Sequence, residues 1–233
     1  MVFITTSVGN EDQHMDWTMF WQPVGLSVRV AFIGSIIAAI VGTAAAWKMT
    51  RCSARGKVLL ETLFMLPLVL PPSVVGFLLL VLLGRNSWIG RTIEWVAGAP
   101  ILFTWWAAVI ASVVVAFPLV YQTMKNGFAS VERSLQDAAR SDGANELQVF
   151  RYITTPLAIR SFATAYLLGF ARGLGEFGAT LMIAGNIPGK TQTISTAVYI
   201  AMDTGNIAMA WAWTLSIVMI SFLLLLLIRQ GQK

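Results

Sequence analysis

The sequence predicts an all-α integral membrane protein with five transmembrane helices, its N-terminus outside the cell and its C-terminus inside. Of its 233 residues, 57% are hydrophobic and only 12% are charged, and the mean hydropathy of +0.72 is far too high for a soluble domain. Five apolar stretches are each long enough to cross about 30 Å of hydrocarbon as a helix. They cover residues 24–47, 58–83, 101–124, 161–184 and 207–228. No linker or internal repeat divides residues 1–233, so we expect a single transmembrane domain.

The distribution of cations predicts the orientation. Of the 16 Lys and Arg residues, eleven fall in the two loops and the C-terminal end that this topology places inside, and three fall outside. This asymmetry follows the positive-inside rule. The pI of about 9.7 therefore reflects membrane orientation, and we expect no nucleic-acid partner. The remaining two cations, Arg29 and Arg172, lie within predicted spans, where Arg29 favours snorkelling toward the nearer interface over a pore role.

Most enzyme classes lack support in this sequence. One cysteine and one histidine provide neither an intrachain disulfide nor a His/Cys metal cluster. The HExxH, GxSxG and GxxxxGK[ST] motifs are absent, so we expect no catalytic residues, no metal, no cofactor and no ATP hydrolysis by a phosphate loop. Residues 1–16 have no basic or apolar signal region and are expected to be retained.

The second span contains three prolines, Pro67, Pro71 and Pro72, each of which removes a backbone donor. We expect this helix to be kinked or broken and to face protein or a cavity, because freed carbonyls are costly in lipid. A purely structural kink and a place in the translocation path both remain open.

The fourth span is the most polar. Arg172 and Glu176 are four residues apart, so they share a helix face and can pair. Arg172 could present positive potential to an anion, or the pair could brace the bundle; both alternatives stay open. Gly169 and Gly173 form a GxxxG spacing, which favours close helix packing over a hinge.

The segment from Asn126 to Arg160 is the only long polar stretch between apolar ones, and it retains a helical pattern. Ser134 and Asp137 predict a capping-box helix start, and Gly143 predicts the end of that helix. A second short helix should carry Leu147, Phe150 and Ile153 roughly on one side until Pro156 interrupts it. The pattern thus predicts two short helices that meet at Gly143 in a docking loop over residues 126–160.

This docking loop resembles the EAA loop of the membrane subunits of ABC importers. The matching positions are Asp137, Ala138, Ala139, Gly143 and Pro156, with Asp where the family usually has Glu. LPLVLPPSVVGFLLL from Leu66, FPL from Phe117, LGEFGAT from Leu174 and NIPGKTQTI from Asn186 are similar to the bacterial molybdate permease family. Together these motifs cover most of the chain from Leu66 to Ile194.

The resemblance implies a type I ABC importer permease in the inner membrane of a bacterium, which imports molybdate or tungstate. It implies a homodimer that binds two copies of a cytoplasmic ATPase and is served by an extracytoplasmic binding protein, with membrane lipid around it. The EAA loop would be the ATPase-coupling element, with Leu147 and Phe150 as anchors. Alternatives are a sulfate or thiosulfate permease, a secondary anion carrier that uses Arg172, and a structural assembly factor.

Overall fold

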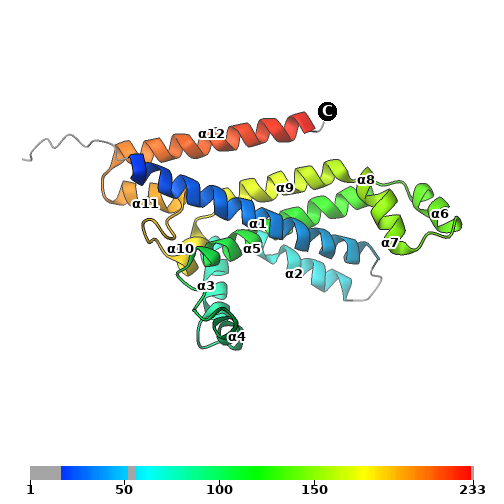
Figure 1. Ribbon diagram of the computed structural model, residues 1–233, viewed down its shortest axis with the longest axis horizontal. Helices are drawn as coiled ribbons and strands as arrows, with labels where there is room; N and C mark the ends of the chain where they lie inside the picture. Colours follow the sequence, from blue (N-terminus) through cyan, green and yellow to red (C-terminus); the bar gives the residue numbers. More distant parts are fainter. Residues whose placement is uncertain (1–16, 52–55, 232–233) are drawn as a thin grey trace, which may run out of the picture.

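The computed structural model describes residues 17–51 and 56–231, and within these ranges the chain is built from helices. Three helices lie side by side at its centre: α1 (Trp17–Arg51), α5 (Trp105–Ala129) and α9 (Ile159–Leu174) (Figure 1). Their contact surfaces carry fully buried small side chains such as Ala31, Ala107 and Ala111. Small residues let helix backbones approach closely, which is how helices pack tightly where surrounding lipid removes the hydrophobic driving force.

Three of the described helices are long and apolar enough to span a membrane: α1, α5 and α12 (Ile207–Gly231). Helix α12 lies on the outside of the bundle beside α1 and α9 (Figure 1). Its start is attached to α1 through Trp213, whose Nε1–H donates to the carbonyl of Phe20 at 3.1 Å. Large apolar side chains along α12, including Phe222 and Leu225, are exposed, as expected of a surface that faces lipid.

The second predicted span is two helices, α2 (Lys57–Val69) and α3 (Pro72–Leu83), with a bend of 114° between them. The predicted break in this span is confirmed. Leu70 and Pro71 have extended backbone, and Pro72 occupies the first turn of α3, where a missing N–H costs nothing. The N–H groups of Val74 and Val75 donate to the Pro71 carbonyl, so the new helix satisfies the group freed by the break.

The fourth predicted span is also broken, which corrects the continuous helix expected over residues 161–184. Helix α9 ends at Leu174, and α10 (Gly178–Ala184) continues at an angle of 64°. The break has a local cause, because the carboxylate of Glu176 accepts a hydrogen bond from the N–H of Ala179 in the first turn of α10. Each broken pair can count as one span, which gives up to five membrane crossings by length and composition.

Two helices lie in segments that the sequence analysis treated as loops. Helix α4 (Trp88–Ala97) fills the predicted loop after the second span; Ser87 caps its start by accepting the N–H of Gly90, and Gly98 ends it at φ 71°. Helix α11 (Ile194–Asp203) follows the NIPGK turn. Both are too short to give a span signal, although Ile89, Ile93 and Val96 of α4 recur at helical spacing.

The described loops that carry most of the cations gather at one end of the bundle. Helix α1 ends there, α2 begins there, and α5 leads there into four short helical segments (Figure 1). These segments are α6 (Arg133–Ser141), α7 (Glu146–Val149), the π-helical η1 (Phe150–Thr154) and α8 (Thr155–Leu157). Together they project beyond the ends of the long helices. We call this projection, residues 133–157, the docking segment.

Candidate functional site: the docking segment and the broken spans

Helix α6 begins two residues earlier than the predicted capping box implies. Its N-cap is Glu132, and no side chain caps it, so the predicted capping box at Ser134 and Asp137 is wrong. The Ser134 hydroxyl, now inside the first turn, donates instead to the carboxylate of Glu132. The start is set by the preceding Val131, which is buried against the ends of α1 and α5.

The predicted helix end at Gly143 is confirmed. Gly143 has φ 90°, a left-handed conformation that favours glycine. Its N–H donates to the carbonyl of Arg140, and the N–H of Ala144 donates to the carbonyl of Ala139, both at 3.0 Å. These two bonds form a Schellman motif, which satisfies the last carbonyls of α6 and reverses the chain.

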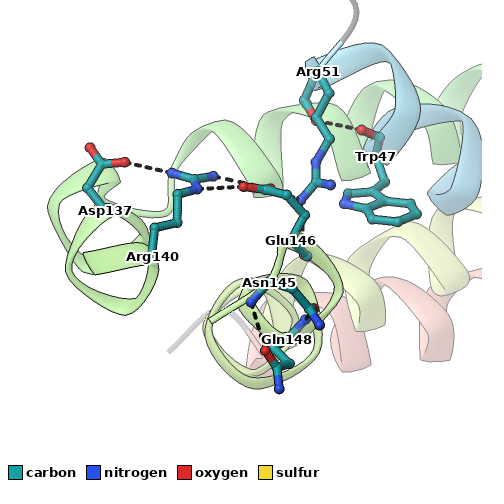
Figure 2. A network of polar contacts seen from close by, with 8 residues as sticks. Trp47, Arg51, Asp137, Arg140, Asn145, Glu146 and Gln148 are labelled. Atoms are coloured by element: carbon teal, nitrogen blue, oxygen red, sulfur yellow. Dashed lines mark hydrogen bonds and ion pairs between the residues drawn. The ribbon is translucent and has the colours of Figure 1, made fainter. Parts of the chain in front are cut away.

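A capping box does exist in this segment, at the start of α7. The side chain of Asn145 accepts the N–H of Gln148, and the Gln148 side chain accepts the N–H of Asn145 (Figure 2). The sequence analysis missed it, although Asn followed by Gln three residues later is a recognisable signal. The box fixes where α7 starts directly after the turn at Gly143.

Glu146, the first residue of α7, joins three helices. Its carboxylate accepts from Arg140 of α6 at 2.7 Å and pairs with Arg51 at the end of α1, also at 2.7 Å (Figure 2). Arg140 also pairs with Asp137 at 2.6 Å. The hydrogen bond from Arg140, with the positive charge of Arg51, holds the pKa of Glu146 below its usual range, and Glu146 and Asp137 raise the pKa of Arg140. This network was not predicted.

The second half of the docking segment turns inward. Phe150 packs against Trp47 and Phe128, with ring centroids 4.6 Å and 5.7 Å apart, whereas Leu147 is 63% exposed. The two therefore do not share one side as expected, and Phe150 anchors the segment to its own bundle. The reason is that Val149, 1% exposed, takes the innermost position and the chain widens to a π-helix directly after it.

Pro156 does not end the helical path. The regular α-helical hydrogen bonding stops before Pro156, as predicted. However, Pro156 lies in the first turn of α8, where its missing N–H is tolerated. Helix α9 then begins at Ile159 after a single break at Ala158. The docking segment is thus connected to α9 by an almost continuous helical path.

The outer surface of α6 combines small and charged residues. Asp137 and Ala138 are exposed, and Ala139 is half-buried. Leu135, 46% exposed, lies on the same helix, and Leu147 of α7 adds a second exposed apolar side chain. Small side chains beside apolar ones permit another protein to approach closely and to bury the larger residues.

Arg172 and Glu176 pair as predicted, with Nη1 to Oε2 at 2.8 Å. The Glu176 side chain is 1% exposed and that of Arg172 is 27% exposed. Because Oε1 of Glu176 also caps α10, the carboxylate holds both sides of the break between α9 and α10. The contacts of Glu176 therefore join α9 to α10.

Glycines make the central packing possible, as the GxxxG spacing predicted. A Cβ at Gly173 would collide with the Oγ of Ser112 on α5, and one at Gly34 of α1 would lie 2.5 Å from the same atom. Gly169 meets Val120 at 3.0 Å. The three helices α1, α5 and α9 therefore touch around Ser112 with no spare room.

An ion pair between α2 and α5 was not predicted. Glu61 of α2 accepts from Lys125 at 2.7 Å and from the hydroxyl of Tyr121 at 3.1 Å, both on α5. A lone carboxylate in a predicted span was the available signal. This pair ties the first half of the broken second span to the central helix.

At the opposite end of the bundle, Arg29 lines a cavity of about 550 Å³ together with Lys190. Among the described residues neither cation takes part in an ion pair. Phe103, in the same lining, has φ 59°, which is uncommon for a residue other than glycine. Arg29 therefore lines a cavity, whereas the sequence favoured snorkelling over a pore role.

The described residues contain no group of three His, Cys, Asp or Glu side chains that could hold a metal ion. The prolines Pro67, Pro71 and Pro72 lie at or near the α2–α3 break, far along the chain from the docking segment. The candidate residues thus form two separate sets: one at the docking segment, and one at the two broken spans.

Known proteins resemble this chain over most of its length. The sequence is 57% identical to the "Putative molybdenum transport system permease protein YvgM" of Bacillus subtilis (strain 168), over 91% of this chain and 93% of that one. It is 43% identical to the molybdenum transport system permease protein ModB of Escherichia coli (strain K12), over 79% and 80% of the two chains.

Solved structures show the same fold. A chain of the MetNI methionine ABC transporter, in an inward-facing conformation, superimposes with a TM-score of 0.71 at 15% identity, over 93% of this chain and 98% of that one. The family described as "Binding-protein-dependent transport system inner membrane component" matches residues 32–230. The chain is a multi-pass membrane protein with the fold of ABC importer permeases, and it belongs to the binding-protein-dependent transport system inner membrane component family.

Proposed function

We propose that this chain is the membrane subunit of an ATP-driven importer of molybdate or tungstate, with its N-terminus outside and its C-terminus inside. The observation that carries the proposal is the 57% and 43% identity to proteins named for molybdenum transport, over most of the chain. The sequence has no phosphate loop, so a separate ATPase supplies the energy. A soluble binding protein delivers the oxyanion, as the family description requires of its members.

The docking segment is the coupling element in this proposal. Its outer surface presents Asp137, Ala138 and Leu147, while Phe150 and Val149 fix it to the bundle. Two copies of the ATPase would each bind one docking segment of a permease homodimer. Because Glu146 ties α6 to α1 and the π-helix leads into α9, a displacement of α6 reaches two central helices.

The translocation path is proposed along the broken spans. The α2–α3 break with its three prolines and the α9–α10 break with Arg172 and Glu176 both expose irregular backbone, which membrane proteins keep where protein or water covers it. Arg172, still 27% exposed, keeps part of its guanidinium free to face an anion. Because the chain has two such breaks, we propose that the translocation path opens when the angle between the two helices of a broken span changes.

Reconstitution tests the function directly. Purified permease, its ATPase and its binding protein are placed in proteoliposomes, and ATP-dependent uptake of labelled molybdate is measured. We expect uptake only when all three proteins and ATP are present. Uptake without the ATPase or the binding protein would refute the proposal and indicate a secondary carrier.

A sulfate or thiosulfate permease is the second candidate, because sulfate has the same shape and charge as molybdate. The same proteoliposomes distinguish the two when each binding protein is loaded with molybdate, tungstate or sulfate. We expect molybdate and tungstate to stimulate ATP hydrolysis and sulfate to leave it at the basal rate. Stimulation by sulfate alone would overturn the substrate assignment and leave the transport mechanism intact.

A further inference from the structure

A basic cavity of about 540 Å³ lies where the docking segment meets the ends of the long helices. Its lining comes from the ends of α1 and α5, the start of α2, and from α6 and η1. Five cations contribute to it, against one acidic residue, Asp137. The five are Arg51, Lys57, Lys125, Arg133 and Arg140.

The carboxylates around this basic cavity do not balance the cations. Arg51 and Arg140 share Glu146, Arg140 also pairs with Asp137, and Lys125 pairs with Glu61. Five cations against three carboxylates leave two positive charges. Within the part of the chain that the structure describes, Lys57 and Arg133 have no ion pair at all, and they are the residues that a bound anion would neutralise.

One of the residues that line the basic cavity, Trp47, carries an unused hydrogen-bond donor. Its Nε1–H is buried and has no hydrogen-bond partner among the residues that the structure describes. Leaving a buried donor without an acceptor is unfavourable, so such groups generally have a partner. A phosphate oxygen is an acceptor that suits both this N–H and the two unpaired cations.

The volume of the basic cavity and the apolar surface beside it favour a lipid over a free ion as the bound anion. Cavities of about 300–1,000 Å³ hold molecules much larger than a five-atom oxyanion. Next to Lys57, the side chains of Val58 and Leu59 are 71% and 76% exposed, so apolar surface adjoins the basic lining. Basic pockets between membrane helices at the cytoplasmic side are typical sites for anionic head groups.

We propose that the basic cavity binds the phosphate of an anionic phospholipid head group, through Lys57, Arg133 and the indole N–H of Trp47, with the acyl chains beside Val58 and Leu59. The bound head group would connect α2 to α6, and so stabilise the position of the docking segment. This proposal does not depend on which substrate is transported.

The test measures lipid binding to purified full-length permease in detergent, by native mass spectrometry and by the shift in thermal unfolding temperature. Phosphatidylglycerol and cardiolipin are compared with phosphatidylcholine. We expect the two anionic lipids to bind and to raise the unfolding temperature, and phosphatidylcholine to do neither. Equal binding of all three lipids would overturn the proposal.

Charge-matched variants separate a specific site from general attraction. The double variant Lys57→Gln with Arg133→Gln should bind phosphatidylglycerol about 30-fold more weakly, from the usual contribution of each cation. Lys48→Gln with Arg160→Gln removes the same charge outside the cavity lining and should leave affinity unchanged. Equal losses in both double variants would refute a specific site. Because none of these four cations makes an ion pair with a described residue, both double variants should unfold at the wild-type temperature without lipid.

Two further arms identify the ligand. Trp47→Phe keeps an aromatic ring beside Phe150 but removes the N–H, and we expect weaker lipid binding with unchanged basal stability. Inorganic phosphate and molybdate are titrated as competitors. Displacement of phosphatidylglycerol by millimolar phosphate or molybdate would overturn the lipid assignment and identify a soluble-anion site.

Discussion

Substituting Gly143 by alanine tests whether the end of α6 is the element that docks to the ATPase. Gly143 has φ 90°, and nothing lies within 4 Å of where a Cβ would be, so the substitution introduces backbone strain without a steric clash. A left-handed conformation costs an ordinary residue about 1–2 kcal/mol. If the strained turn rearranges, the docking-competent population falls, and apparent affinity falls by up to about 5- to 30-fold.

The chain provides a matched control at Gly205. Gly205 has φ 77°, likewise with nothing within 4 Å of a Cβ, and it ends α11 by the same pair of hydrogen bonds, from Gly205 to Met202 and from Asn206 to Ala201. Gly205→Ala therefore introduces the same local strain far along the chain from the docking segment. Any difference in ATPase affinity between Gly143→Ala and Gly205→Ala therefore depends only on where in the protein the strained residue lies.

The assay titrates purified ATPase onto immobilised, detergent-solubilised permease and reads the dissociation constant. We expect Gly143→Ala to weaken binding and Gly205→Ala to leave it at the wild-type value, with similar thermal unfolding of the two variants. Gly143→Arg should abolish co-purification of the ATPase while membrane insertion persists. Equal affinities for wild type and both alanine variants would refute a docking role for the end of α6.

Three other predictions concern packing, the braced break and pH. Gly173→Ala should lower stability by about 1–3 kcal/mol, because its Cβ meets the Oγ of Ser112, and adding Ser112→Ala should recover most of the loss in thermal unfolding, since that Oγ is the nearest atom. Glu176→Ala should lower the unfolding temperature more than Glu176→Gln, because glutamine keeps an acceptor for the Ala179 N–H; equal effects would contradict the capping role. The lowered pKa of Glu146 means that its ion pairs stabilise α7 above the usual carboxyl range near pH 4 and that this contribution is lost as pH falls through the lowered pKa. The rate of amide exchange in residues 146–149, corrected for intrinsic rates, should rise in the wild type as the pH falls through that range. In Glu146→Gln the corrected rate should stay constant.

The sequence predicted the features that short stretches of residues determine. Apolar length gave α1, α5 and α12, proline content gave the α2–α3 break, and glycine chemistry gave the end of α6 at Gly143. Each of these depends on a residue and its immediate neighbours, so tertiary structure had little to change.

The features that were not predicted from the sequence depend on contacts between segments that are distant in the chain. Arg51 and Glu146 are 95 residues apart, and no local pattern pairs them. The capping box at Ser134 failed because burial of Val131 determines where the helix starts. The α9–α10 break depends on Glu176, whose role as a cap becomes visible only when α10 bends away from α9.

The arrangement of braces indicates which parts of the bundle can move. Helices α1, α5 and α9 meet around Ser112 with no room for sliding, since Gly34 and Gly173 both press against it. A force on α6 reaches α1 through Glu146 and Arg51 and reaches α9 through η1, so both routes lead to the same tightly packed group of helices. We therefore expect the three helices to move as one body and the bend at α2–α3 to absorb most of the displacement, because backbone hydrogen bonding is interrupted there and no described ion pair joins α2 to α3, whereas Glu176 joins α9 to α10.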